Sequence, residues 1–326
     1  MHQNVWLIQL KMKLFLQRNK MFEQHRNPSI TSLLPKTKGK YQANEPLSKH
    51  TWLAVGGPAE VLYHPKDADD LKHFLQNKPH NIPVYLIGGG SNLLIRDGGI
   101  LGVVIKLDNK NFQQIEIGPD YIKCGAGLPN AMLTKTLLKH ELGGLEFLCS
   151  IPGVIGGSIK TNAGCFGSEI KDVLISAEVM NGLGQINTLP AQDFNLSYRN
   201  SLFPDDWIIL SVTLKTYSDK KENIKNILEQ HKNYRKQHQP HNVKTAGSTF
   251  KNPQGLKAWE LIKNSGCASL SVGGAKVSEI HNNFLINTGT ATAADIEELG
   301  EQIIACVKEK TSITLEWEIK KLGVKK

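Results

Sequence analysis

The hydrophobic positions between residues 80 and 215 gather mainly in short runs. Short apolar runs bounded by glycine, proline or polar residues are typical of strands. They predict strands at 82–87, 102–107, 115–117, 121–124, 173–179 and 208–214. Strands therefore outnumber helices in this part of the chain, which predicts the α+β class.

Helical spacing occurs at two places, one before these strands and one between them. Asp67 and Asp70 precede apolar positions three and four residues apart, which predicts a capped helix that begins near residue 67. Pro129 is typical of the first turn of a helix, and Gly143 is expected to close that helix. Residues 151–167 are rich in glycine and show no clear period, so we expect an extended loop.

The pattern changes in the last third of the chain. Segments 220–236 and 258–262 show helical spacing. Thr292 and Asp295 have the spacing of a capping box and precede a third helical stripe. Because the sequence becomes more polar and more helical here, we expect a domain boundary near residue 217.

The last apolar segment alternates cleanly between apolar and polar positions. Its apolar positions are Ile313, Leu315, Trp317 and Ile319. A period of two places Glu316 and Glu318 together on the opposite face. We therefore expect a strand over 313–320 that carries both carboxylates on its polar side.

Length and composition describe a globular protein of several domains. The chain has 326 residues, of which 40% are hydrophobic and 21% charged, and this length predicts two or three domains. The net charge of +9 comes from 39 basic and 30 acidic residues. It favours an anionic ligand such as a nucleotide diphosphate, or nucleic acid. Because the sequence has no arginine-rich helix and no basic–aromatic interleaving, nucleic acid is the less favoured of the two.

Cysteine and histidine spacing gives no metal or disulfide pattern. The five cysteines are odd in number and lack Cys-x-x-Cys spacing, and no His-Glu-x-x-His sequence is present. We therefore expect no metal site, no disulfide framework and a reducing, cytoplasmic environment.

The N-terminal region differs from the rest of the chain. Residues 5–16 are apolar but too short to span a membrane, and Lys11 and Lys13 interrupt them. They also lack the basic start and the cleavage site of a signal peptide. We expect residues 1–46 to be a loose arm or a misassigned start, with Met21 as the true first residue.

Two glycine-rich segments are candidates for cofactor binding. The first directly follows a predicted strand and consists of Gly88, Gly89, Gly90, Ser91 and Asn92. Consecutive glycines let backbone N–H groups converge on an anion such as a pyrophosphate. The segment is not a Rossmann fingerprint, because Leu93 occupies the third glycine position. An ordinary tight turn is the alternative.

The second glycine-rich segment lies within residues 151–167. Its candidate cofactor contacts are Gly153, Gly156, Gly157 and Asn162. Such a loop can lay its backbone along a large, flat cofactor, because long loops in compact domains usually have a function. The alternative is a structural loop that packs small residues beneath a sheet.

A serine-centred segment is the candidate for proton transfer. Ser248 is followed by Lys251 and Asn252, so a hydroxyl, a cation and an amide stand close together. This combination suits a proton donor beside an anionic substrate. Because Ser248 has neither an adjacent histidine nor a Gly-x-Ser-x-Gly elbow, a Ser-His-Asp hydrolase is disfavoured.

Tyr198 and Arg199 precede a predicted strand. The guanidinium of Arg199 is planar, always charged and shaped to bind a carboxylate or a phosphate. A solvent-exposed arginine without such a ligand is the commoner case and stays the alternative.

Six segments taken together resemble one family. They are GGGSNL at 88, GLEFLCSIPGVIGGSIKTNAG at 144, SYRNSLF at 197, AGSTFKNP at 246, VGGAKVSEIHNNFLIN at 272 and LEWEIKKLG at 315. In this order and spacing they are similar to the bacterial UDP-N-acetylenolpyruvoylglucosamine reductases. The similarity runs from Thr51 to Gly323 and is to the second type of this family, which lacks a tyrosine-containing insertion.

The resemblance implies an α+β fold that is divided into an FAD-binding domain and a substrate-binding domain. An FAD-binding domain of the p-cresol methylhydroxylase type, made of two subdomains, is expected at 47–217. A C-terminal substrate-binding domain is expected at 218–312. Residues 313–326 are expected to return to the first subdomain, which would bring Glu318 to the flavin.

The resemblance also implies an activity and its residues. FAD, bound without a covalent link, would accept a hydride from NADPH and reduce UDP-N-acetylglucosamine enolpyruvate to UDP-N-acetylmuramate for peptidoglycan synthesis. Arg199 would stabilise the enolate-like charge, Glu318 would share a proton with it, and Ser248 would protonate the carbon. Substrate contacts are implied for Tyr198, Lys251, Asn252 and His281. The enzyme is expected to be a cytoplasmic bacterial monomer that binds neither membrane nor nucleic acid.

Two other functions stay open from the sequence. One is a different flavin oxidoreductase of the same fold, with FAD tethered through a histidine or cysteine. Residues 88–93 hold neither, although Cys149 and Cys165 flank the second glycine-rich segment. The other is a non-catalytic binder of nucleotide or nucleic acid, which the net charge of +9 suggests.

Overall fold

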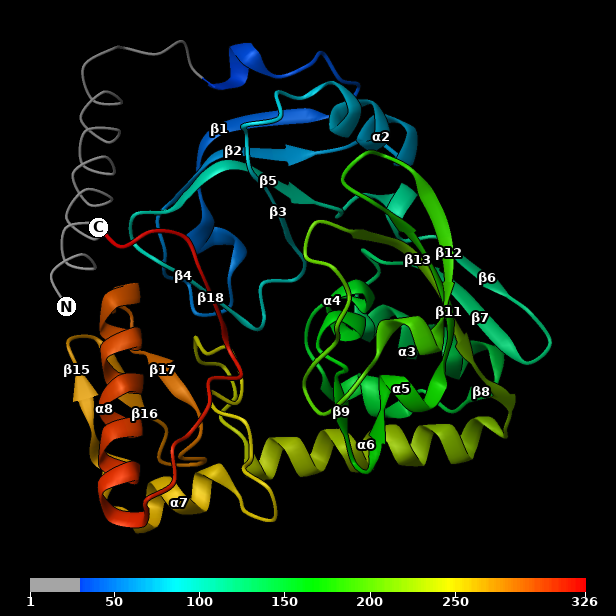
Figure 1. The fold of residues 1–326 in the computed structure, drawn as a ribbon. Coiled ribbons are helices and arrows are strands. Elements are labelled where there is room, and N and C mark those ends of the chain that lie inside the picture. The colour runs from blue at the N-terminus through cyan, green and yellow to red at the C-terminus, as the bar shows by residue number, and fades with distance from the viewer. Residues whose placement is uncertain (1–29) are drawn as a thin grey trace, which may run out of the picture.

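The computed structural model describes residues 30–326, which form three packed units (Figure 1). The expectations for residues 1–29, including the apolar segment 5–16 and a start at Met21, lie outside the described residues. The expectation of a loose arm up to residue 46 is wrong for residues 40–46, because they form a strand that pairs with residues 58–64. Within residues 30–326, no helix has both the length and the hydropathy needed to cross a membrane.

The first unit is a four-stranded sheet covered by one helix. The strand order is β1 (Lys40–Pro46), β2 (Pro58–His64), β5 (Ile100–Lys106) and β3 (Val84–Ile87). β1 is antiparallel to β2, whereas β2 and β3 run parallel to β5. Helix α2 (Ala68–Asn77) buries Leu71 and Phe74 against this sheet. Asp67 caps the helix by accepting a hydrogen bond from the backbone N–H of Asp70, as predicted.

The second unit is an antiparallel five-stranded sheet. Its strand order is β12 (Ile186–Pro190), β11 (Leu174–Met180), β13 (Ile208–Lys215), β7 (Tyr121–Gly125) and β6 (Ile115–Ile117). Helices α3 (Asn130–His140), α4 (Ile155–Lys160) and α5 (Ile170–Val173) share one apolar core with this sheet. The apolar runs predicted every strand except β12, which is mostly exposed and therefore lacks an apolar run.

Two short strand pairs border this sheet. β8 (Leu142–Gly143) pairs with β14 (Tyr217–Ser218), and β9 (Gly164–Cys165) pairs with β10 (Ser168–Glu169). Both pairs are antiparallel; β8 contacts α6, and β9 contacts the 3-10 helix Glu146–Ser150.

Two predictions for this unit are wrong in detail. Residues 151–167 are not one extended loop, because α4 occupies Ile155–Lys160. Its apolar contacts come from Ile155 and Ile159, and the neighbouring glycines hid that spacing in the sequence. Helix α3 ends at Glu141 in the left-handed region rather than at Gly143, which belongs to β8.

Helix α6 (Lys221–His238) confirms the predicted polar helix and leads to the third unit. It buries Ile224 and Leu228 and packs against α3, β8 and the 3-10 helix Glu146–Ser150 of the second unit. Figure 1 shows α6 running beneath the second sheet.

The third unit pairs helices with a small sheet. It contains α7 (Ala258–Asn264), the antiparallel strands β15 (Ser271–Val272), β16 (Ala275–Val277) and β17 (Leu285–Asn287), and α8 (Ala293–Thr311). Thr292 and Asp295 form the predicted capping box of α8. The three strands were not predicted, because each has only two or three residues.

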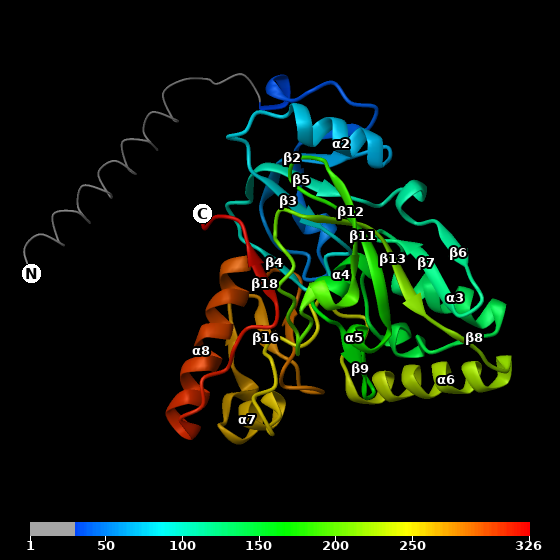
Figure 2. The same ribbon diagram turned by 45° about the vertical axis from the view of Figure 1, so that its right-hand side comes forward.

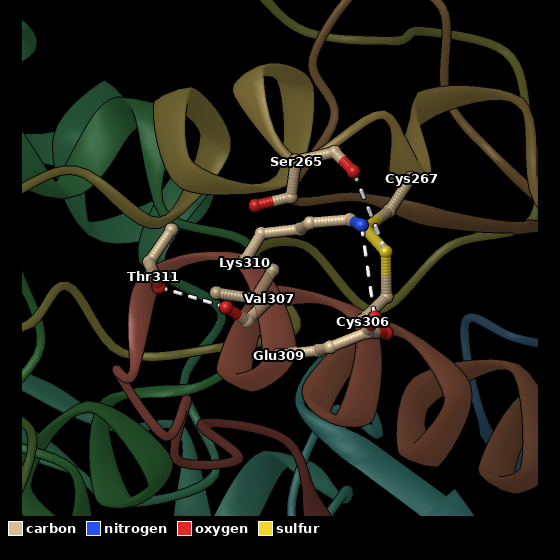
Figure 3. Close-up of a disulfide and its surroundings, with 7 residues drawn as sticks. All are labelled: Ser265, Cys267, Cys306, Val307, Glu309, Lys310 and Thr311. Atoms are coloured by element: carbon tan, nitrogen blue, oxygen red, sulfur yellow. Dashed lines mark hydrogen bonds and ion pairs between the residues drawn. A yellow bond between two sulfur atoms is a disulfide. The ribbon is translucent and has the colours of Figure 1, made fainter.

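The third unit also contains a disulfide that the cysteine spacing did not predict. Cys267 and Cys306 are bonded across 39 residues of sequence (Figure 3). Helix α8 packs against the 3-10 helix Cys267–Ser269, and this packing brings the two sulfur atoms together. The expectation of no disulfide framework is therefore wrong for this pair, whereas Cys124, Cys149 and Cys165 are free.

The C-terminal segment returns from the third unit to the first. Strand β18 (Lys320–Leu322) runs parallel to β4 (Leu93–Ile95), and Figures 1 and 2 both show the two side by side. The prediction of a strand over 313–320 is wrong in its bounds, because β18 begins only at Lys320 and the residues before it pair only through a bridge between Phe250 and Trp317. Leu315 and Ile319 are buried, as the alternation predicted.

Candidate active site

The two glycine-rich segments lie directly against each other. A Cβ atom on Gly89 would stand 2.8 Å from the Cα of Gly153, and one on Gly88 would stand 2.9 Å from Val154. The hydroxyl of Ser91 donates to the carbonyl of Pro152 at 2.9 Å, which fixes the two turns together. Glycine is therefore required here, because any side chain would force the turns apart.

The turn at 88–92 presents unpaired backbone donors. Within residues 30–326, the backbone N–H groups of Gly89, Gly90 and Ser91 donate to no protein backbone carbonyl. The carbonyl of Gly90 accepts from Trp52 at 3.0 Å, which holds the turn at its φ of +67°. Converging N–H groups in a glycine turn bind phosphate oxygens. The unpaired donors of this turn therefore suit a ligand that carries phosphate.

The predicted cofactor contacts of the second glycine-rich segment differ in their hydrogen bonds and their exposure. Gly156 donates its N–H to Ala126 at 2.8 Å and is fixed within the unit, whereas Gly157 is exposed. Asn162 is fully buried, donating to Glu169 and to the carbonyl of Ser197. Its side-chain oxygen accepts from the N–H of Lys171. The amide of Asn162 is thus occupied by protein partners, so the structure gives no support to a side-chain contact with a cofactor.

Tyr198 and Arg199 form the tip of a tight hairpin. Ser197 and Asn200 exchange backbone hydrogen bonds of 3.0 and 3.1 Å on either side of the tip. Arg199 has a φ of +52°, in the left-handed region that non-glycine residues seldom occupy. Such strain is often found at functional sites. The bond from Asn162 to Ser197 anchors this hairpin to the second glycine-rich segment.

Arg199 and Glu318 meet although they lie 119 residues apart. The Nε of Arg199 donates to Glu318 Oε1 at 2.8 Å, and its Nη2 donates to the carbonyl of Gly164 at 2.8 Å. Within the described residues, Arg199 Nη1 and Glu318 Oε2 have no hydrogen-bond partner. This pair therefore keeps one free donor group and one free acceptor for a ligand.

Burial controls the electrostatics of Glu318. It raises the pKa of the Glu318 carboxyl above its ordinary value, and the opposing effects of Arg199 and Lys251 do not cancel it. The glutamates expected to share one face differ strongly, since the side chain of Glu318 is 17% exposed and that of Glu316 is 75% exposed. Glu316 forms an exposed ion pair with Lys251 at 3.3 Å.

The segment around Ser248 is held at both edges. On one side Asn283 accepts from the N–H of Phe250 at 2.9 Å and donates to its carbonyl at 2.8 Å. On the other side the N–H of Glu318 donates to the carbonyl of Thr249 at 2.8 Å. The Ser248 hydroxyl is half-buried and has no hydrogen-bond partner within residues 30–326. Its environment therefore leaves the hydroxyl available to a ligand.

The turn at 88–92 also touches the C-terminal segment. Asn92 donates its amide N–H to the carbonyl of Glu318 at 3.2 Å, and its own carbonyl accepts from Lys320 at 3.1 Å. The predicted cofactor turn, Glu318 and the Ser248 segment are thus joined through backbone hydrogen bonds.

Lys251, one of the four predicted substrate contacts, pairs with Glu316 as described above. The other three have different surroundings. The ring of Tyr198 lies 5.1 Å from the Arg199 guanidinium carbon, and its hydroxyl accepts from the N–H of Asn252. The side chain of Asn252 accepts from Ala258 at 3.0 Å and so caps α7. Burial lowers the pKa of His281, and its Nδ1 accepts from the N–H of Asn283. The neutral ring of His281 therefore carries its proton on Nε2.

Sequence reasoning missed two groups that build this site. Asn283 brackets Phe250, and the carbonyl of Gly164 positions Arg199. Asn283 lies in one of the six family-like segments, at 272–287. Its contact with Phe250 could not be predicted, because the two residues are 33 positions apart in the sequence. Backbone carbonyls such as that of Gly164 leave no signal in a sequence.

Within residues 30–326, no group of three histidine, cysteine, aspartate or glutamate residues is placed to hold a metal ion.

Comparison with known proteins decides the family. Residues 59–189 match an FAD-binding domain, and residues 239–322 match the C-terminal domain of UDP-N-acetylenolpyruvoylglucosamine reductase. The reductase of Paramagnetospirillum magneticum is 44% identical over 90% of this chain and 95% of its own. That of Orientia tsutsugamushi strain Boryong is 47% identical over 90% of this chain and 97% of its own. The chain belongs to the UDP-N-acetylenolpyruvoylglucosamine reductase family.

A solved structure of this family has the same fold. The reductase from Thermus caldophilus is 33% identical and superposes with a TM-score of 0.77, covering 88% of this chain and all of the other. The fold class is therefore α+β with an FAD-binding domain and the reductase C-terminal domain, as the six segments predicted. The family match over residues 59–189 shows that the cofactor of this chain is FAD.

Proposed function

We propose that this chain reduces UDP-N-acetylglucosamine enolpyruvate to UDP-N-acetylmuramate, with NADPH as hydride donor, in the synthesis of peptidoglycan precursors. The observation that carries the proposal is the meeting of Arg199, Glu318 and the Ser248 segment beside the paired glycine turns. The family to which the chain belongs supports the same reaction. The rival functions, a different flavin oxidoreductase and a non-catalytic binder, have no comparable support.

The glycine turns hold the cofactor in this proposal. The N–H groups of Gly89, Gly90 and Ser91 bind its phosphate oxygens, and Gly153 gives its backbone close access. When bound, FAD reduced by NADPH supplies the hydride that the terminal carbon of the enolpyruvyl group receives. Asn162 acts through the Arg199 hairpin rather than through a cofactor contact.

Arg199 stabilises the negative charge that develops on the substrate. Hydride addition to the terminal carbon moves charge through the neighbouring carbon into the carboxylate. The free Nη1 of Arg199 is available to these oxygens, while Gly164 and Glu318 fix the guanidinium. A charge that is positioned before the reaction needs no reorganisation, which is the largest source of rate enhancement in many enzymes.

Glu318 holds a proton beside this charge. Burial raises the pKa of this carboxyl, so Glu318 takes up a proton more readily than an exposed glutamate, and in our proposal it shares that proton with a carboxylate or enolate oxygen of the substrate. Once the substrate carries an additional negative charge, the hydrogen bond through this proton becomes stronger. Glu318 thus complements Arg199 without adding a competing negative charge.

Ser248 delivers the final proton. The carbon that bears the ether oxygen must receive one proton to complete the reduction. The hydroxyl of Ser248 has no protein partner, and backbone bonds to Asn283 and Glu318 fix the segment that carries it. Fixed geometry allows a weakly acidic hydroxyl to protonate a reactive carbanion equivalent.

The uridine diphosphate part is assigned to the open side of the Ser248 segment. Lys251 offers a cation, His281 an Nε2–H donor and Tyr198 an exposed ring. Asn252 contributes through its position in the turn, because its side chain caps α7. The enzyme acts as a cytoplasmic monomer on this small-molecule substrate in our proposal.

An absorbance experiment tests the function. The purified protein is expected to be yellow, to lose its flavin absorbance with NADPH under anaerobic conditions, and to regain it when the enolpyruvyl substrate is added. After denaturation the colour is expected in the filtrate, since FAD is held without a covalent bond. A protein that binds FAD and is bleached by NADPH, but is not reoxidised by this substrate, would be another flavin oxidoreductase.

A further inference from the structure

The tip of the hairpin formed by β9 and β10 has a strained backbone. Phe166 and Gly167 join the two strands, and both have a positive φ, of +55° and +81°. Two positive φ values in a two-residue loop are typical of a type I′ turn, for which Asn-Gly is a preferred sequence. A bulky side chain is unfavourable in this conformation. The turn itself therefore does not explain a phenylalanine at position 166.

Helix α6 supplies the contacts of the Phe166 ring. The ring stacks on that of His231, with centroids 3.8 Å apart and an interplanar angle of 5°. The ring of Tyr234 meets it edge-on, at 5.6 Å and 81°. Phe166 is nevertheless 42% exposed, so it is not a core residue. Because ring contacts stabilise a structure beyond the burial of their area, they attach the strained tip to α6. Figures 1 and 2 both show β9 beside this helix.

The same hairpin carries a group of the proposed active site. The carbonyl of Gly164, at the start of β9, accepts from Arg199 Nη2 at 2.8 Å. A Cβ atom on Gly164 would stand 2.6 Å from the carbonyl oxygen of Ser168 and 2.6 Å from the side chain of Glu169. The two strands are thus packed so closely that a movement of the tip also moves the Gly164 carbonyl.

The base of the hairpin has a separate attachment. Cys165 Sγ donates to the carbonyl of Phe147 at 3.2 Å and lies 3.1 Å from Ser150 Oγ. Arg235 of α6 donates to the carbonyl of Ser150. The sulfur contacts therefore fix the base of the hairpin against residues 146–150, whereas the aromatic rings fix its tip against α6.

We propose that Phe166 is a positioning residue for the reduction proposed above. Its stack on His231 holds the Gly164 carbonyl in place, and this carbonyl directs the guanidinium of Arg199 toward the substrate. Phe166 thus acts through Gly164 and Arg199 and not through a contact of its own with the substrate. The inference rests on the proposed function, because it concerns the group that stabilises the charge developing on the enolpyruvyl carboxylate.

Phe166→Asn separates this role from a role in folding. The variant has the Asn-Gly sequence that a type I′ turn prefers, so it keeps the turn and loses the ring. It is expected to fold and to bind FAD with the stoichiometry of the parent enzyme. By stopped-flow absorbance, NADPH is expected to reduce its flavin at the parent rate. Reoxidation by the enolpyruvyl substrate is expected to fall by about 10–10²-fold, because a small misplacement of a catalytic group is costly.

Three further variants assign this effect to the ring stack. Phe166→Tyr keeps the ring and is expected to retain both rates. His231→Ala removes the other ring, leaves the turn unchanged and is expected to slow reoxidation as Phe166→Asn does. Leu183→Asn is the matched control, because Leu183 is 65% exposed and also precedes a glycine of positive φ in a turn between two strands. It is expected to match the parent enzyme.

A double variant tests whether Phe166 acts through Arg199. Substitutions that act on one group are not additive, so adding Phe166→Asn to Arg199→Lys is expected to change the reoxidation rate by less than about threefold. A further loss as large as that in the parent background overturns the proposal. Parent-like reoxidation in Phe166→Asn, or an equal loss in both half-reactions, also overturns it. A parent enzyme that this substrate does not reoxidise would instead contradict the proposed function, and with it this inference.

Discussion

Two arginine–glutamate pairs join distant parts of this chain, and they differ in how completely they are paired. Arg96 binds both oxygens of Glu297, through Nε at 3.0 Å and Nη2 at 2.9 Å, and donates to the carbonyl of Gly323. Arg199 binds one oxygen of Glu318, and the second oxygen has no partner in the described part of the chain. The first pair connects the first unit to α8, and the second lies in the proposed active site.

The carboxyl pKa values of the two pairs shift in opposite directions. The hydrogen bonds from Arg96 lower the pKa of Glu297, whereas burial raises the pKa of Glu318. Lys321 adds a second cation beside Glu297 at 3.6 Å. A carboxylate with complete pairing holds two parts of a protein together, whereas one with a free oxygen and a raised pKa can exchange a proton. We therefore propose a structural role for the first pair, and the second pair fits the catalytic role proposed above.

The largest difference is expected from the same substitution in the two arginines. Arg199→Lys is expected to reduce kcat by about 10²–10³-fold, because lysine lacks the fork that faces both Glu318 and the substrate. Arg96→Lys is the matched control and is expected to retain kcat. Steady-state oxidation of NADPH measures both. Similar losses in the two variants would remove the distinction between the pairs.

Removing each carboxylate charge is expected to affect stability in the reverse order. Glu297→Gln is expected to lower the free energy of unfolding at pH 7 by about 2 kcal/mol, because it weakens a paired, charge-assisted hydrogen bond. Glu318→Gln is expected to change it by less than about 1 kcal/mol, since the neutral amide suits a buried position. Urea unfolding followed by circular dichroism gives both values. A larger loss in the Glu318 variant would indicate that this pair, too, is structural.

The pH dependence of stability gives the smallest expected effect. The folded pKa of Glu297 is lowered, so its contribution is present above the unfolded pKa and is lost as pH falls through the folded pKa. The folded pKa of Glu318 is raised, so its contribution is present at low pH and is lost as pH rises through the folded value. We therefore measure the free energy of unfolding with urea at several pH values. Glu297→Gln is expected to lose part of the decrease in this free energy toward low pH. Glu318→Gln is expected to lose part of the decrease toward high pH.

The sequence predicted those parts of the fold that carry a local signal. Helices α2, α6 and α8 have clear apolar spacing, and two of them also have capping residues. Helix α4 was missed because glycines break its apolar stripe. The bond between Cys267 and Cys306 was missed because it depends on the packing of α8 rather than on spacing.

The candidate site was predictable in its residues and in part of its arrangement. The family-like segments named Arg199, Ser248 and Glu318 and implied the return of the C-terminal segment, whereas the contact between Arg199 and Glu318 is seen only in the folded chain. The second oxygen of Glu318 and the carbonyl of Gly164 are features of the folded chain. Asn162 shows the reverse case, because a residue named for cofactor binding is occupied by protein partners.

The proton transfer proposed for Ser248 belongs to the reoxidation of the flavin by the substrate and not to its reduction by NADPH. Ser248→Ala removes the hydroxyl and leaves the backbone bonds of its segment in place. Thr249→Val is the matched control, since its neighbouring hydroxyl is buried and unpaired. Both variants are compared with the parent enzyme by stopped-flow absorbance of the bound flavin. The control is expected to match the parent enzyme in both half-reactions.

Reoxidation of the reduced Ser248→Ala enzyme by the enolpyruvyl substrate is the most direct test of the proposed site. We predict that NADPH reduces the flavin of this variant at the parent rate, whereas the reoxidation rate falls by about 10²–10⁴-fold. Reoxidation at the parent rate would contradict the assignment of Ser248 as the proton donor.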